Sequence, residues 1–180
     1  MSADQPGASL SEFDAGDAPP FVFKSPEGVM LCFGCRTLNR CRLGLLNETL
    51  QSDGVVISEI ECPPEHEGGP QVAHGGWTAG IFDELVGHTL LLHDEFVVTG
   101  TLEIVFTKPV PVSRPLIGRA SVVRHEGRRV YVTAELTLAS NGAVVGTANA
   151  IMVRRPSDHF DRHQKWLSLQ NGEQGGSTHA

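Results

Sequence analysis

The 180-residue sequence lacks any apolar run long enough to span a membrane, since a spanning helix needs about 20 such residues in succession. It also lacks the basic and then apolar stretch that marks a secretory signal, because residues 1–20 carry acidic side chains instead. We therefore expect a cytoplasmic protein with no membrane span. Residues 1–20 are polar and contain proline and glycine, which predicts a disordered segment.

The sequence lacks the second close pair of cysteines that a zinc ribbon requires. Cys32 and Cys35 form a C-x-x-C pair, whereas Cys41 and Cys62 are isolated, and His66 is the histidine that could complete a zinc site. Disulfides are rare in the cytoplasm. The sequence thus favours four reduced thiols and no metal.

Lysine and arginine are absent between Arg42 and Lys108, where eleven acidic residues occur. The segment from Lys108 to Arg155 has the opposite character, with eight basic residues against two acidic ones. A net charge of −7 argues against non-specific binding of nucleic acid, so we expect no nucleic-acid partner. The basic segment suits a compact anionic ligand such as a nucleotide or a phosphorylated cofactor, although ordinary solvated strand faces would also explain these residues.

One long stretch without proline, residues 74–93, has the pattern of a helix. At about 100° per residue its apolar side chains cover most of the circumference, which predicts a buried helix. Gly76, Gly80, Asp83 and Gly87 share one narrow stripe. Glycine costs about 1 kcal/mol relative to alanine within a helix, so we expect another backbone to approach this stripe closely. Asp83 is then a candidate catalytic carboxylate, the alternative being an acid that pairs with a neighbour or faces water.

The helix opens on His74-Gly75-Gly76. Small residues at a helix start leave N–H groups accessible where the helix dipole favours negative charge, so these amides could polarise a bound carbonyl. Asp83 lies seven residues after Gly76, or about 10 Å along the axis. One substrate group reaches both only if it lies along the helix, if the glycines precede the helix proper, or if the amides of one copy face the Asp83 of another.

Alternating apolar residues predict two strands before this helix, at 43–51 and 55–61, and four after it, at 96–107, 116–124, 130–138 and 143–153. In the strand at 96–107 the alternation puts Thr99 and Thr101 on the face opposite to Val98 and Leu102. This order indicates an α+β fold in which a curved antiparallel sheet wraps around one long central helix. Residues 156–180 are predicted to be a polar tail with a short helix near 163–169.

Three motifs follow one another along the chain: CFGC at 32–35, GGPQVAHGGWTAGIFDELVG at 68–87, and TGTLEIVFTKP at 99–109. Together they resemble the hotdog-fold acyl-CoA thioesterases, in particular the PaaI-like branch, whose signature places DE shortly after HGG. The resemblance runs from about residue 32 to residue 153 and implies a single hotdog domain over residues 21–155.

The resemblance implies an enzyme that hydrolyses the thioester of an acyl-coenzyme A (acyl-CoA) to the free acid and coenzyme A, with no cofactor besides the coenzyme A of the substrate. It also implies a homodimer, or a dimer of dimers, with active sites at the subunit interface. Asp83 would be the general base or the nucleophile. The Gly75 N–H would polarise the thioester carbonyl while His74 shapes the loop, and Thr99 matches the hydroxyl that positions the attacking water.

Substrate-binding residues are implied as well. The partner subunit or the thioester would approach Gly76, and Gly68 stands where family members use an asparagine to orient the substrate. Arg128 and Arg129, with Lys108 behind them, are the best candidates for binding the phosphates of coenzyme A. The main alternative to a thioesterase is a hotdog dimer that binds an acyl-CoA or a lipid without turnover, which the missing asparagine favours.

Three further polar residues lie on the helix. Glu84 could compete with Asp83 for the acid role, but it lies about 100° away from the glycine stripe. His88 and His93 are interpreted as an ordinary helix-face residue and a helix-end residue. A hydratase would need a catalytic histidine facing an acid across the pocket, and that arrangement is not recognisable in the sequence.

Overall fold

The computed structural model describes residues 23–174, with side chains over residues 23–170. The predicted disordered segment at 1–20 and the last six residues of the tail lie outside the described residues. Within the described range, no helix combines the length and the apolar character that crossing a membrane requires.

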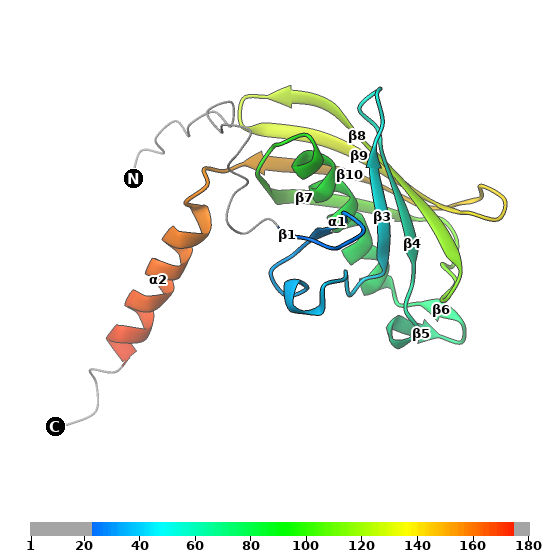
Figure 1. Ribbon diagram of the computed structural model, residues 1–180, viewed down its shortest axis with the longest axis horizontal. Helices are drawn as coiled ribbons and strands as arrows, with labels where there is room; N and C mark the ends of the chain where they lie inside the picture. The colour runs from blue at the N-terminus through cyan, green and yellow to red at the C-terminus, as the bar shows by residue number, and fades with distance from the viewer. Residues whose placement is uncertain (1–22, 175–180) are drawn as a thin grey trace.

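Six antiparallel strands form one curved sheet around the helix α1, Gly75–Leu92 (Figure 1). Their spatial order is β3-β4-β8-β9-β10-β7, so β3 and β7 are the edge strands. The sheet and the helix confirm the predicted α+β class, and each predicted strand is present with its ends shifted by at most two residues. The strands are β3 (Leu45–Leu50), β4 (Val56–Glu61), β7 (Val97–Phe106), β8 (Pro115–Glu126), β9 (Arg129–Leu138) and β10 (Val144–Arg154).

Shorter elements lie outside the main sheet. Between residue 23 and α1, two short turns of 3-10 helix occur, Arg36–Leu38 and Pro64–His66. Two small antiparallel pairs are also present, β1 (Phe23–Lys24) with β2 (Met30–Leu31), and β5 (Glu67–Gly69) with β6 (Val72–Ala73).

The polar tail contains a longer helix than the sequence predicts. Helix α2, His159–Gln174, begins soon after β10 and extends away from the sheet (Figure 1). Near its start the Phe160 ring lies 5.7 Å from the Phe96 ring, edge to face. Further along, Trp166 is 53% exposed. The first turn of α2 therefore contacts the segment just before β7. The rest of the helix, over its described side chains, buries no apolar face.

The core lies between α1 and the sheet. Beneath the helix, the strands carry residues without bulky side chains: a Cβ on Gly118 would lie 2.6 Å from Leu85 Cδ2, and one on Gly146 would lie 3.1 Å from Phe82 Cε2. These glycines let the large side chains of the helix rest directly on the sheet. Burial of each such side chain contributes about 1.5–3 kcal/mol, which holds α1 in one position. The fully buried apolar residues of α1 are Ile81, Phe82, Leu85, Val86 and Leu90.

A β-bulge in β7 changes which side chains face the helix. Thr101 pairs with Ile151 and Thr99 pairs with Met152, so Gly100 has no partner on β10. The extra residue reverses the alternation, and Thr99 comes to the face of buried Met152, towards α1. The prediction that Thr99 and Thr101 share a face is therefore wrong, because strict alternation holds only in a strand without a bulge.

Candidate active site

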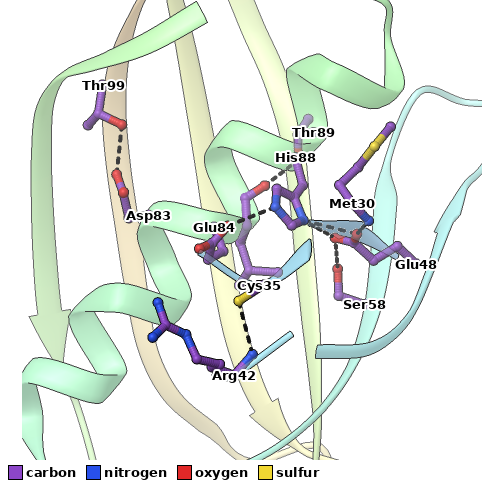
Figure 2. Close-up of polar contacts among 11 residues, drawn as sticks. Met30, Cys35, Arg42, Glu48, Ser58, Asp83, Glu84, His88, Thr89 and Thr99 are labelled. Atoms are coloured by element: carbon purple, nitrogen blue, oxygen red, sulfur yellow. Dashed lines mark hydrogen bonds and ion pairs between the residues drawn. The ribbon is translucent and has the colours of Figure 1, made fainter. Parts of the chain in front are cut away.

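Asp83 and Thr99 form a hydrogen-bonded pair between α1 and the bulged end of β7. Thr99 Oγ1 donates to Asp83 Oδ1 at 2.7 Å (Figure 2). Both residues are solvent-exposed. Among the described residues no donor contacts Asp83 Oδ2, so this oxygen is available as a general base or a nucleophile. The structure thus brings together two residues that the sequence assigns to one site.

The start of α1 presents a free amide at Gly75. His74 is the N-cap, and its Nδ1 accepts a hydrogen bond from the Gly76 N–H at 2.9 Å. The Gly76 amide is therefore occupied, whereas the Gly75 N–H has no acceptor among the described residues. The roles of His74 in shaping the loop and of Gly75 in contacting a carbonyl stay predictions. A free N–H at a helix start is suited to an oxyanion.

Gly68 packs directly against this loop. A Cβ at Gly68 would lie 2.6 Å from His74 Cα and 3.1 Å from the His74 nitrogen, and the His74 N–H donates to the His66 carbonyl at 2.8 Å. The backbone of the loop leaves no space for a side chain at this position. Gly68 therefore fixes the conformation of His74, a role different from the substrate orientation that an asparagine supplies.

Replacing Gly68 by asparagine should damage the site instead of restoring a family feature. Because the new side chain must displace the His74 backbone, we expect the free energy of unfolding to fall by about 1–3 kcal/mol and catalytic activity to fall with it. Gly69→Asn is the matched control, since a Cβ there meets nothing within 4 Å. Urea unfolding and steady-state kinetics of both variants test this, and equal stability of the two would contradict it.

An apolar cavity of about 680 Å³ lies beside Asp83 and Thr99. Gly87, one turn after Asp83 on α1, borders it and has open space where a Cβ would be. The predicted approach of another backbone to the glycine stripe is not seen within the described chain. At Gly80 the neighbour is instead a side chain, since a Cβ there would lie 3.2 Å from Leu43 Cδ1. The apolar wall comes from five parts of the chain and includes Phe23, Phe33, Leu91, Phe96, Val98, Met152 and Phe160.

A buried charged cluster lies in the wall of this cavity, whose lining includes Glu84 and His88. Its link to Glu48 was not predicted from the sequence. His88 Nδ1 lies 2.9 Å from Glu48 Oε1, and His88 Nε2 lies 2.7 Å from Glu84 Oε2 (Figure 2). The Glu48 side chain is fully buried and also accepts from the Met30 N–H at 3.1 Å and from Ser58 Oγ at 3.5 Å. The interpretation of His88 as an ordinary helix-face residue is wrong, since it is 4% exposed and bridges two carboxylates.

The carboxylates keep His88 protonated. Burial alone would lower the pKa of His88, but the hydrogen bonds and charges of Glu48 and Glu84 outweigh it and raise the pKa to about 10. The Glu84 carboxylate is paired with the protonated His88, which makes Glu84 a weaker candidate than Asp83 for the catalytic acid. The spacing of Glu84 and His88, four residues apart on a helix, was the one signal in the sequence. Glu48 is 40 residues away from His88, so no local spacing in the sequence indicated their contact.

The three basic candidates do not form one cluster. Arg129 pairs with Val153 and Thr99 pairs with Met152, so the turn that carries Arg128 and Arg129 lies at the Thr99 end of the sheet. Lys108 follows the opposite end of β7, where its N–H donates to Val145. None of the three basic residues lines the apolar cavity. Among the described residues, no group of three His, Cys, Asp or Glu side chains is arranged to hold a metal ion.

Comparison with known proteins gives partial matches. A family model described as the thioesterase superfamily matches residues 70–145. The acyl-coenzyme A thioesterase THEM4 of Mus musculus is 25% identical over 88 residues, which is 49% of this chain and 38% of that protein. The chain therefore matches about two fifths of the length of this curated relative.

Solved thioesterase structures share the architecture. A hypothetical thioesterase protein from Streptococcus pneumoniae, solved with coenzyme A, has a TM-score of 0.56 at 18% identity, over 61% of this chain and 85% of its own. The BH2602 protein from Bacillus halodurans, also solved with CoA, has a TM-score of 0.53 at 21% identity, over 61% and 73%. The sheet wrapped around α1 is therefore the hotdog fold of the thioesterases, as the sequence motifs predicted.

Proposed function

We propose that the protein is an acyl-CoA thioesterase of the PaaI-like branch, which hydrolyses R–CO–S–CoA to a free acid and coenzyme A. The hydrogen-bonded Asp83–Thr99 pair in the wall of an apolar cavity is the observation that carries this proposal. The match of the thioesterase family model to residues 70–145, which include both side chains, supports it. A cytoplasmic location and the lack of a separate cofactor stay predictions from the sequence.

In this mechanism Asp83 Oδ2 either removes a proton from a water molecule that attacks the thioester carbon, or attacks that carbon itself. Thr99 donates its own proton to Asp83 Oδ1, so its oxygen lone pairs can accept a hydrogen bond from the attacking water. The attack produces a tetrahedral oxyanion, which the free Gly75 N–H would stabilise. Collapse of the oxyanion then expels the thiolate of coenzyme A. In the general-base route this thiolate takes up the proton that Asp83 removed from water; in the covalent route a water molecule then hydrolyses the mixed anhydride on Asp83, which releases the free acid and supplies the proton to the thiolate.

A second copy of the chain would complete the site. Gly75 and Asp83 are eight residues apart on one helix, about 12 Å along its axis, so one thioester carbonyl cannot contact both. The edge strand β7 exposes Val105 and Phe106, at 61% and 57%. Because an apolar strand edge is a template for pairing, we infer a dimer through β7 in which the Gly75 of one copy serves the Asp83 of the other.

The phosphates of coenzyme A are assigned to Arg128 and Arg129, which share the Thr99 end of the sheet. Lys108 lies at the other end of β7, so it would contribute only from the second copy. The test is the affinity for coenzyme A of the Arg128→Ala, Arg129→Ala double variant. Unchanged affinity would exclude this assignment without affecting the role proposed for Asp83.

Thiol release from a panel of short, medium, long and aromatic acyl-CoAs tests the function itself. We expect turnover of at least one acyl class, with the preferred chain limited by the cavity of about 680 Å³. The alternative is an acyl-CoA-binding protein without turnover, which the glycine at position 68 favours. Binding of acyl-CoAs by calorimetry with no thiol release from any of them would support that alternative and reject the thioesterase.

A further inference from the structure

The C-x-x-C motif folds into a tight turn beside the cavity. The Cys35 N–H donates to the Cys32 carbonyl at 2.9 Å, which closes a four-residue turn. The ends of such a turn lie less than about 7 Å apart, and a disulfide joins residues whose Cα atoms are separated by roughly 4.4–6.8 Å. Cys32 is exposed and Cys35 is buried. The backbone therefore already holds the two cysteines at a separation that a disulfide can bridge.

Arg42 lies against this turn and places positive charge beside it. The Arg42 N–H donates to Cys35 Sγ at 3.3 Å (Figure 2). Its guanidinium packs against Gly34, where a Cβ would lie 2.7 Å from Arg42 Nη2, so a larger residue at this position would push the guanidinium away from the turn. Burial raises the pKa of Cys35, but hydrogen bonds from Arg42 and Cys32 and the charge of Arg42 together lower it. Cys35 is thus the thiol of the pair that more readily becomes a thiolate.

The other two cysteines have the opposite environment. Cys41 and Cys62 are buried, and burial raises the pKa of each thiol to about 11. Thiolates, and not thiols, take part in exchange reactions. Cys41 and Cys62 are both buried and poorly ionised, whereas Cys32 is exposed and lies next to the more acidic Cys35, so we expect oxidants to react at the C-x-x-C turn.

We propose that Cys32 and Cys35 form a reversible redox site that exchanges with small-molecule disulfides such as oxidised glutathione. Cys32 is the thiol of the pair that a dissolved disulfide can reach, since it is exposed and Cys35 is buried. Burial and the neighbouring Cys35 raise the pKa of Cys32, so the first step is slow: the fraction of Cys32 that loses its proton attacks the glutathione disulfide, which releases one glutathione and leaves a mixed disulfide on Cys32. The Cys35 thiolate then attacks Cys32 Sγ and expels the second glutathione. Two protein thiols are oxidised to one disulfide, one glutathione disulfide is reduced to two thiols, and the two protons pass to those thiols.

Oxidation at this site would change the wall of the apolar cavity. Cys32 lines the cavity that contains Asp83, and it also lines a second cavity of about 420 Å³ together with Cys35 and Arg42. Formation of the disulfide draws Cys32 Sγ towards Cys35 and removes the thiolate that faces Arg42. The redox state of the turn is thereby linked to the shape of the cavity, while Asp83 and Thr99 lie on other elements.

Mass spectrometry of the full chain incubated with oxidised glutathione tests the proposal. We expect the wild type to lose the mass of two hydrogens, with the disulfide mapped to Cys32 and Cys35 and reversed by dithiothreitol. Cys35→Ser lacks the second nucleophile and should accumulate a glutathione adduct on Cys32. Cys32→Ser should form neither the disulfide nor the glutathione adduct. Cys62→Ser is the control and should behave as the wild type.

Three results would overturn the proposal. The first is a wild type that stays fully reduced under these conditions. The second is a wild type that stops at a stable glutathione adduct, and the third is a disulfide that maps to Cys41 or Cys62. Circular dichroism of each variant confirms that it is folded before its mass is interpreted. Because none of these readouts requires thioester hydrolysis, failure here is separate from failure of the proposed enzymatic function.

Discussion

Replacing Asp83 by asparagine should reduce thioester hydrolysis by about 10²–10⁴-fold, the usual contribution of a positioned general base. Asparagine has the same shape and can still accept the hydrogen bond from Thr99, but it can neither remove a proton nor form a covalent acyl intermediate. Affinity for the product coenzyme A should be unchanged, because the loss falls on the chemical step. Thiol-release kinetics give kcat and KM, and calorimetry gives the affinity for coenzyme A.

The matched control is Asp94→Asn, which removes an exposed acid beyond the end of α1. It should keep wild-type activity, so that any loss in the first variant reflects the position of the carboxylate and not the net charge. Equal activity of Asp83→Asn and wild type would mean that another acid does the chemistry. Glu84 would then be the next residue to test, despite its contact with His88.

Removal of His88 should have the largest effect on stability. In the variant His88→Leu the fully buried Glu48 loses its cationic partner, and breaking a buried pair in this way costs about 3–5 kcal/mol. Adding Glu48→Leu removes the unpaired charge as well, so the double variant should recover much of the loss. Urea unfolding of the three proteins measures these differences. A single variant as stable as the double one would show that Glu48 does not depend on His88.

The same cluster predicts a dependence of stability on pH. The pKa of His88 is raised from 6.5 to about 10 in the folded protein, so the stabilisation is fully present below pH 6.5 and is lost as the pH rises through 10. Between these values the free energy of unfolding should fall by up to about 1.4 kcal/mol per pH unit. The Glu48→Leu, His88→Leu variant lacks this slope and serves as the reference. If the free energy of unfolding changed with pH in the same way in both proteins, the pH dependence would not come from His88 and its pairing with Glu48.

The sequence was sufficient for the features that depend on local periodicity. The apolar circumference of residues 74–93 predicted α1, and alternation predicted all six strands of the sheet. The motif around Asp83 also predicted the fold family, which the structural comparisons support. Periodicity works here because one long helix and a curved sheet each bury a continuous face, so most positions follow a single pattern.

The features that the sequence missed depend on contacts between distant segments. Thr99 reaches Asp83 because the bulge at Gly100 turns it towards α1, and a bulge is defined by pairing with β10. His88 bridges to Glu48 across the gap between α1 and β3, which no local pattern encodes. The first turn of α2, with Phe160, completes the cavity wall although its sequence reads only as a polar tail.

The division of the cavity between segments has a consequence for how this protein can diverge. The family model matches residues 70–145, which contain the proposed catalytic residues, whereas much of the apolar wall comes from residues 23–33 and from the first turn of α2. Substitutions in these flanking segments can alter which ligand fits while Asp83 and Thr99 stay in place. Under the proposed function, the catalytic residues and a large part of the ligand-binding wall would lie on separate stretches of the chain, so that the flanking segments could be exchanged or redesigned while the catalytic residues are kept.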